Sequence, residues 1–142
     1  MRFYFAGSFN RREELLGYAL RLETLGHAVT SRWLLGTHEV LAGDDELSTG
    51  GRAPIYARED LEDIDRASGF VLFSSKDHPQ KGRGGRHTEF GCALQSGKMI
   101  VIIGRREHAF HSLIPDFLVF KDFDQFFRWL TVEDLSTPLR RA

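Results

Sequence analysis

The chain has 142 residues and a mass of 16.2 kDa, with 42% hydrophobic and 27% charged residues, so it can bury the core of one globular domain spanning 1–142. Its formal net charge of −1, from 19 basic and 20 acidic residues, excludes the overall basic field of a protein that binds a nucleic acid polymer. A single cysteine, Cys92, excludes an internal disulfide, and there is neither an apolar run of membrane-spanning length nor a signal-peptide core, so we expect a cytoplasmic protein without a membrane partner.

Short apolar runs alternate with amphipathic stretches from the N-terminus onward. The run "RFYFA" predicts a first strand over 2–6. Asn10 is placed to cap the helix that follows, with an acid in the capping-box position, and Gly26 ends that helix. The run 27–31 predicts a second strand, and the polar, turn-rich run 43–54 predicts a long loop.

The same signals predict the remaining elements. In chain order these are a helix over 55–67, a strand over 69–73, a helix over 88–96, a strand over 99–103, a short strand over 117–120 and a final helix that Asp122 caps.

Strands that alternate with helices predict an α/β fold. The runs 69–73 and 99–103 are continuously apolar, which is typical of strands that helices cover on both faces. Right-handed crossovers then favour a flavodoxin-like open parallel sheet of about five strands with helices on both faces. Ligands bind such sheets beyond the carboxyl ends of the strands, where the strand order reverses. We therefore expect the loops after 2–6 and 69–73 to lie side by side and to form the site.

The loop after the third predicted strand is rich in glycine and in positive charge. Glycines at 82, 84 and 85 permit close backbone approach, so amide N–H groups can line an anion, and the next helix adds its positive end. The basic residues Lys81, Arg83 and Arg86 strengthen the preference for a negative ligand group. The alternative is a solvated basic turn.

Glu89 is predicted to lie in the first turn of the helix after this loop. The helix dipole there keeps a carboxylate ionised, as a nucleophile requires. A carboxylate at the anomeric carbon of a sugar forms the covalent intermediate of retaining glycosidases. The alternative is that Glu89 only stabilises the helix start.

A second acid could assist from the helix over 55–67. Asp60 and Asp63 lie one turn apart on it, and either could reach the site. The alternative is a solvated acidic face, which is the ordinary interpretation for most of Glu59, Glu62, Asp63 and Asp65.

Aromatic residues and histidines give weaker signals. Tyr4 belongs either to the core or to the site, and Trp33 either stacks on a base or covers the sheet. His108 and His111 are three residues apart, but no carboxylate or cysteine completes a ligand set. We therefore expect neither a metal nor another cofactor.

Together these segments resemble the nucleoside 2-deoxyribosyltransferase superfamily, which also includes deoxynucleoside 5′-monophosphate N-glycosidases and CMP hydrolases. The resemblance covers most of the chain, through "FYFAGSF", "DLEDIDRASGFVLF" and "GRGGRHTEFGCALQSGKMIVII". Its most specific elements are the Glu-hydrophobic-Gly-x-Ala pattern and a small-Gly-Lys turn, seen here as Glu89-Phe90-Gly91-Cys92-Ala93 and Ser96-Gly97-Lys98.

The resemblance implies roles for individual residues. The family's nucleophile falls on Glu89, its assisting aspartate on Asp60 rather than Asp63, and its first-strand tyrosine on Tyr4. Family members are oligomers in which a neighbouring subunit contributes a residue to the 5′ end of the substrate, here Ser112 or His111. The complete predicted substrate-binding set is Gly7, Ser8, Trp33, Arg83, Gly85, Arg86, His87 and Ser112.

Three departures from the family pattern bear on the substrate. Arg83 stands where several transferases carry an acid, a glycine-arginine turn replaces the serine-glycine phosphate turn of the hydrolases, and His87 matches neither subgroup. The positive loop favours a phosphorylated or otherwise anionic substrate, whereas the overall similarity favours a transferase.

We therefore expect an enzyme that cleaves the N-glycosidic bond of a 2′-deoxynucleoside or its 5′-monophosphate through a glycosyl-enzyme on Glu89, and that passes the sugar to a free nucleobase. One alternative is transfer to water, as in a (deoxy)nucleoside 5′-monophosphate N-glycosidase. A second is a phosphoribohydrolase of the lysine-decarboxylase-like type, to which "GGRHTE" is faintly similar. A third is a non-catalytic nucleotide-binding sensor module.

Overall fold

The structure is a computed structural model that describes residues 1–36, 52–75 and 84–133. Within these ranges the strands and α-helices are, in chain order, β1 (Arg2–Ala6), α1 (Arg12–Glu23), β2 (Ala28–Val29), α2 (Ala53–Arg66), β3 (Gly69–Phe73), α3 (Gly85–Gln95), β4 (Met99–Ile103), β5 (Val119–Phe120) and α4 (Phe123–Val132). The 3-10 turns that the argument uses are η1 (Phe9–Arg11), η2 (Arg32–Leu35), η4 (Ala109–Leu113) and η5 (Asp116–Leu118).

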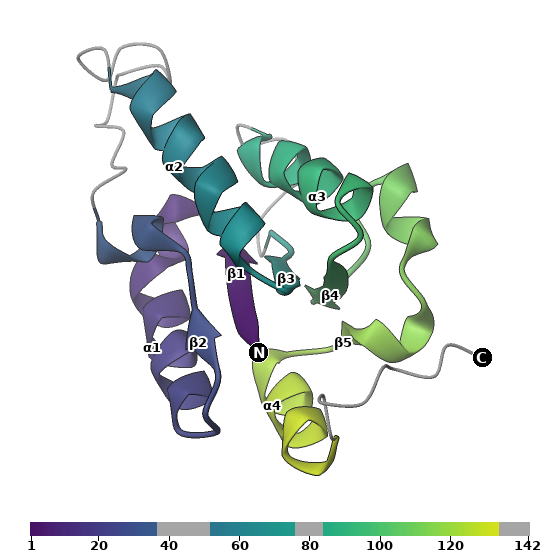
Figure 1. Ribbon diagram of the computed structural model, residues 1–142. Helices are drawn as coiled ribbons and strands as arrows, with labels where there is room; N and C mark the ends of the chain where they lie inside the picture. The colour runs from purple at the N-terminus through teal and green to yellow at the C-terminus, as the bar shows by residue number, and fades with distance from the viewer. Residues whose placement is uncertain (37–51, 76–83, 134–142) are drawn as a thin grey trace.

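The five strands form one parallel sheet in the order β2-β1-β3-β4-β5 (Figure 1). The strand order reverses between β1 and β3, because the chain moves from β1 to one edge and then returns past β1 to β3. Every residue of β3 and β4 is buried, as expected of strands that are covered on both faces. The predicted flavodoxin-like α/β fold is confirmed.

Helices cover both faces of this sheet (Figure 1). α1 and α4 share one face, where the Tyr18 and Phe123 rings stack with centroids 4.2 Å apart. Arg21 of α1 also donates to Asp124 of α4 at 2.7 Å. α2 and α3 share the other face and together line a surface groove. None of the helices in the described part of the chain combines the length and the apolar character that crossing a bilayer requires.

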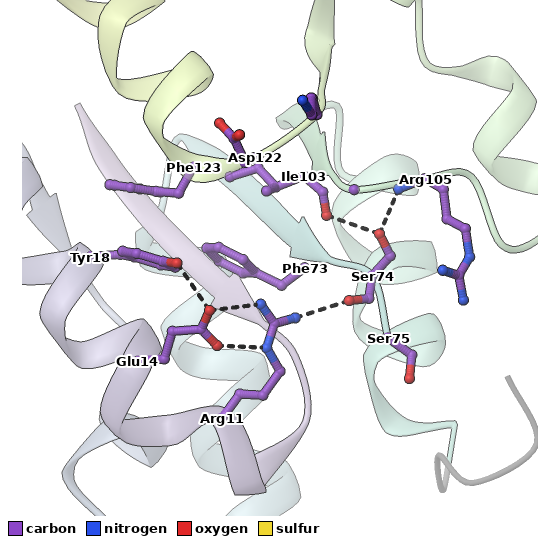
Figure 2. A pocket seen from close by; sticks show the side chains of 12 residues that line it. Arg11, Glu14, Tyr18, Phe73, Ser74, Ser75, Ile103, Arg105, Asp122 and Phe123 are labelled. Atoms are coloured by element: carbon purple, nitrogen blue, oxygen red, sulfur yellow. Dashed lines mark hydrogen bonds and ion pairs between the residues drawn. The ribbon is translucent and has the colours of Figure 1, made fainter. Parts of the chain in front are cut away.

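The loops after β1 and β3 lie side by side at the carboxyl edge of the sheet, as predicted. The Arg11 guanidinium, after β1, donates from Nη1 to the carbonyl oxygen of Ser74, after β3, at 2.9 Å (Figure 2). Glu14 accepts from Arg11 Nε at 2.8 Å and from the Tyr18 hydroxyl at 2.9 Å. These groups line a cavity of about 400 Å³ on the α1 and α4 side of the edge. The network ties together the two loops at which the site was expected.

Both α1 and α2 begin elsewhere than their sequence signals predict. Asn10 does not cap α1, because it lies inside the 3-10 turn η1 and Arg11 occupies the N-cap position, where its side chain makes no capping hydrogen bond. α2 begins at Ala53, with Pro54 in its first turn, rather than after a loop that runs to 54. Proline suits this position because the first N–H groups of a helix have no intrahelical partner. The rest of the predicted loop, 43–51, lies outside the described residues.

α3 begins at Gly85 rather than at Thr88. Gly84 precedes the helix in the left-handed region, at φ 80°, which glycine reaches without the steric penalty of a side chain. The His87 N–H then donates to the Gly84 carbonyl at 3.0 Å and closes the first turn. Two of the glycines that were assigned to the loop therefore form the helix start.

Two strands are shorter than predicted. β2 covers only Ala28–Val29 of the run 27–31, because the Ser31 hydroxyl accepts from the Phe5 N–H at 2.7 Å and donates to the Phe5 carbonyl at 3.2 Å. The Ser31 side chain thus replaces the backbone groups that would otherwise pair with Phe5 in a longer strand. β5 covers only Val119–Phe120, because the preceding residues form η5. The Asp122 cap of α4 is confirmed, with Oδ1 accepting from the Gln125 N–H at 2.9 Å.

Candidate active site

Three side chains that were predicted to be catalytic, Tyr4, Asp60 and Glu89, come together between β1, α2 and α3. Tyr4 is fully buried, and the charges of Glu89 and Asp60 both act on its hydroxyl. Of the two carboxylates, Glu89 has the larger effect on that hydroxyl. One carboxylate oxygen of Asp60 and one of Glu89 are shielded from solvent. The cluster therefore combines a phenol with carboxylates from two different helices.

The alternation of side chains along β1 directs Tyr4 into this cluster. Phe3 faces the opposite layer, where its ring meets Phe126 of α4 at a centroid distance of 5.9 Å. Tyr4 instead stacks on Phe70 of β3 at 5.6 Å, and Phe70 meets Phe90 of α3 at 6.3 Å. Tyr4 is thus both a core residue and a wall of the candidate site.

The electrostatic environment keeps the Tyr4 hydroxyl protonated. Burial raises the pKa of Tyr4 well above its ordinary value, and the charges of Glu89 and then of Asp60 raise this pKa further. A phenol in that state donates a hydrogen bond to a carboxylate and does not compete with it as an anion. The site therefore combines a neutral potential donor with carboxylates from two helices.

Glu89 lies in the second turn of α3 and not in the first. The first helical residue is Gly85, and the first turn contains no acidic side chain. Because the influence of the helix dipole falls off within the first turn, helix-start stabilisation is a weak explanation for Glu89. Its charge acts instead on the buried Tyr4 hydroxyl.

Asp63 belongs to the structural framework, so its assignment to a solvated acidic face was wrong. Its side chain is 0% exposed. It accepts from the Arg32 N–H at 2.9 Å and from Arg32 Nε at 2.8 Å, and it also pairs with Arg66. The Thr30 hydroxyl donates to its backbone carbonyl at 2.8 Å. These contacts join α2 to the segment after β2.

Arg86 does not stand in a solvated basic turn. It is 7% exposed and pairs with Glu107 at 3.2 Å, so its charge is compensated inside the protein. Glu107 was missed by the sequence reasoning. The sequence feature that could have identified Glu107 is its position within "GRREH", directly after a buried strand and at the edge where the site was expected.

His87 lies on a different flank of α3 from Glu89, since two residues correspond to roughly 200° around a helix. Its ring contacts His111 and His108 at centroid distances of 5.4 Å and 5.9 Å. Burial lowers the pKa of His87, and burial lowers that of His111 to about 4. Among the described residues no group of three or more His, Cys, Asp or Glu side chains is arranged to hold a metal ion.

Trp33 and Ser112 occupy contrasting positions. Trp33 is 6% exposed and donates from Nε1 to the Phe5 carbonyl at 2.8 Å, as expected of a residue that covers the sheet. Ser112 is exposed in η4, and its hydroxyl donates to the Ala109 carbonyl at 2.6 Å. His111, the other residue considered for a neighbouring site, is 1% exposed.

The remaining predicted binding residues follow the strand ends. Gly7 and Ser8 are half-buried directly after β1, and a Cβ on Gly7 would meet Leu15 at 3.0 Å. Gly85 is the first residue of α3. Arg83 lies outside the described residues, together with Lys81.

Comparisons with known proteins agree on the fold. No protein-family model and no curated protein matches the sequence. The structure is similar to that of a CMP N-glycosidase, BcmB, from Clostridium botulinum, with a TM-score of 0.56, 15% identity and coverage of 94% of this chain and 100% of that one. It is also similar to a 2-deoxyribosyltransferase from Bacillus psychrosaccharolyticus, with a TM-score of 0.64, 21% identity and coverage of 96% and 94%. Both likenesses extend over nearly the whole chain, and the fold they share is the one that the family resemblance implies.

Proposed function

We propose that this protein is an enzyme that cleaves the N-glycosidic bond of a nucleoside or nucleotide. The observation that carries the proposal is the convergence of Tyr4, Asp60 and Glu89 on the side of the sheet that α2 and α3 cover. A carboxylate held by a neutral hydroxyl, with a second carboxylate beside it, is suited to attack at a sugar's anomeric carbon. The two similar structures are named as enzymes of this chemistry, which supports the proposal.

The reaction has two balanced halves. A carboxylate oxygen of Glu89 bonds to C1′ while the C1′–N bond breaks, and its electron pair leaves with the base, which Asp60 orients or protonates. The Tyr4 hydroxyl holds Glu89 in line. A nucleophile then attacks C1′, displaces the Glu89 carboxylate and loses its proton. No cofactor is needed for either half.

The nucleophile of the second half distinguishes two versions of the proposal. A nitrogen of a second nucleobase gives deoxyribosyl transfer, which is the version we favour because the motif around Glu89 resembles the transferases. Water gives hydrolysis of a nucleoside 5′-monophosphate, which the basic residues before α3 favour. Of the two similar structures, one is named as an N-glycosidase and the other as a deoxyribosyltransferase.

We further propose that the active form is a homo-oligomer with shared sites. Large apolar side chains are exposed between β4 and β5, with Phe110 at 60%, Leu113 at 64% and Phe117 at 46%. Ser112, exposed in the same segment, is the residue that can reach a neighbouring subunit, since His111 is buried. A surface of this kind is typical of a contact between subunits.

The product of incubation with single substrates tests the function. The protein is incubated with deoxynucleosides and with their 5′-monophosphates, each with and without a free base, and the products are separated. Glu89→Gln should abolish release of the base, whereas the control Glu13→Gln, on the exposed face of α1, should not. Mass spectrometry of the acid-quenched native enzyme should detect the sugar ester.

Two outcomes would reject the proposal. Turnover that survives Glu89→Gln would exclude the nucleophile. Saturable nucleotide binding without any release of base, even in long incubations, would identify a sensor module.

A further inference from the structure

Glu107, in the turn after β4, contacts both ends of the segment that joins β3 to α3. Its Oε1 accepts from the Ser75 N–H at 3.3 Å, just before residues 76–83. Its Oε2 pairs with Arg86 Nη2 at 3.2 Å, just after them. One carboxylate therefore holds the last described residue behind β3 and the first turn of α3 at the same point.

The surroundings of Glu107 are buried and hydrogen-bonded. The side chains of Arg86 and Glu107 are 6% and 2% exposed. The Glu107 N–H donates to His111 Nδ1 at 3.0 Å, and the His111 ring packs on Phe90 of α3 at a centroid distance of 4.5 Å. Backbone and side chain of Glu107 are thus both fixed by groups that pack on or belong to α3.

A buried ion pair needs a reason beyond stability. Removing two charges from water is costly, and apolar residues of similar volume often replace such a pair without loss of stability. Here the carboxylate also satisfies a backbone N–H at the end of a strand, which an apolar residue would leave without an acceptor. The pair therefore fits a role in holding backbone in place.

We propose that Glu107 is a positioning residue that fixes both ends of the β3–α3 connection and thereby the first turn of α3, one turn before Glu89. The proposal rests on the proposed function in so far as Glu89 acts at the sugar. The connection leads out of β3 at the edge where the substrate is proposed to bind. Holding the first turn of α3 in advance lowers the cost of arranging it on binding, so the effect belongs in KM more than in kcat.

Two double variants separate positioning from simple burial of charge. Arg86→Met/Glu107→Gln and Arg86→Met/Glu107→Leu both remove the two charges and keep similar volume. Only the glutamine retains an acceptor oxygen for the Ser75 N–H. The pair therefore differs in one hydrogen bond, and neither variant leaves a lone buried charge that would unfold the protein.

Amide hydrogen exchange, measured by NMR, reports how firmly the two ends of the β3–α3 connection are held, and it does not require turnover. The reporters are the N–H of Ser75 and the N–H of His87, which bonds to Gly84 at the start of α3, and the N–H of Val71 within β3 is the control. The leucine variant should exchange about tenfold faster at Ser75 and at His87, since each site loses the support of about one hydrogen bond. The glutamine variant should exchange faster at His87 alone. The exchange rate at Val71 should be unchanged in both variants.

The kinetic measurement follows for the same proteins. KM should rise by about tenfold in the leucine variant and less in the glutamine variant, with kcat within about threefold of the native value. Unchanged exchange at both Ser75 and His87 in the leucine variant would overturn the positioning role. So would faster exchange with an unaltered KM. If the native protein releases no base at all, the proposed function fails, and the exchange data still decide whether Glu107 holds the two ends.

Discussion

Tyr4 illustrates how one residue serves both the core and the candidate site. Its ring stacks on Phe70 in the sheet layer, while its hydroxyl meets the charges of Glu89 and Asp60. The ring supplies packing that any aromatic residue could supply. The hydroxyl is buried where the Glu89 charge acts on it, and in the proposed mechanism it donates a hydrogen bond to that carboxylate.

The Tyr4→Phe variant separates these two contributions. We expect turnover to fall by roughly 10- to 100-fold, because a hydrogen bond to a charged group contributes about 1.5 to 3 kcal/mol. The melting temperature should stay within a few degrees, since the ring and its stacking remain. Because the pKa of Tyr4 is raised, the native enzyme should show no loss of activity from tyrosine ionisation up to pH 10. Steady-state rates and thermal unfolding of the two proteins check this, and undiminished turnover in Tyr4→Phe would remove the hydroxyl from the mechanism.

Asp60 and Asp63 show what sequence spacing could not decide. Both lie on one helix, one turn apart, so periodicity places them equally well for a role in the site. The difference comes from Arg32, which is 31 residues from Asp63 in the sequence and is brought to it by packing. Such a partner has no local signature, and the family pattern, not the spacing, favoured Asp60.

The two aspartates should respond to substitution in opposite ways. Asp63→Asn should lower the free energy of unfolding by about 2 to 3 kcal/mol, because it weakens buried charge-assisted hydrogen bonds to Arg32 and Arg66. Asp60→Asn should change stability far less and should reduce turnover. Urea denaturation and rate measurements on both variants test the contrast. A fully stable Asp63→Asn protein would contradict the structural role given to this residue.

At the scale of elements, the sequence predicted every strand and α-helix of the described residues, with the exact bounds of β1, β3 and β4, but not the bounds of β2, β5 and the first three helices. Apolar runs and helical spacing identify β3, β4 and α4 because burial dictates those patterns over several residues. The ends depend on single hydrogen bonds and single backbone angles. Ser31 replaces a strand partner with its hydroxyl, and Gly84 starts α3 early by adopting positive φ. Neither event follows from periodicity.

The packing of η4 on α3 should make the fold sensitive to acid. Burial lowers the pKa of His111 to about 4, and it lowers the pKa of His87 by less. The Arg86 charge lowers both pKa values further, whereas the Glu107 charge raises them. A lowered folded-state pKa means that the unfolded chain takes up protons first as the pH falls below about 6.5. Stability should therefore be fully present above about pH 6.5 and should decline from there to about pH 4.

Urea denaturation at several pH values measures this decline. For the native protein we expect a loss on the order of 2 kcal/mol from His111 between pH 7 and pH 4. His111→Asn, which offers an acceptor to the Glu107 N–H and does not titrate, should show a shallower decline. His27, whose pKa burial also lowers, is unaltered in this variant, so the comparison isolates His111. Equal slopes in the two proteins would show that the imidazole is protonated as readily in the folded state as in the unfolded one.

At the scale of the whole molecule, the alternation of strands and helices was sufficient to predict the sheet. Parallel strands, right-handed crossovers and one reversal of strand order leave few arrangements, and the observed order β2-β1-β3-β4-β5 is among the simplest. The same reasoning placed the loops after β1 and β3 at one edge, and the family resemblance, not the topology, assigned Tyr4 to the site. It could not indicate that Arg86 turns inward to Glu107, because an internal ion pair depends on the detailed packing of α3 over β4.

The proposed shared site predicts that two differently damaged chains complement each other. If a neighbouring subunit contributes Ser112, then Glu89→Gln and Ser112→Arg should damage the same site from two different chains. A mixed dimer of the two variants contains one doubly damaged site and one native site. After equal amounts are unfolded together and refolded, about half of the dimers should be mixed, so activity should return to about one quarter of the native value.

The measurement is the rate of the refolded mixture, compared with each variant refolded alone. Light scattering on the native protein supplies the second test, since a shared site requires a mass that is a multiple of 16.2 kDa. Leu113→Glu, in the exposed apolar segment, should shift that mass toward one chain and lower activity together, because a buried charge opposes the contact. A native mass of 16.2 kDa, or a mixture no more active than its parts, would mean that each chain binds its substrate with its own residues alone.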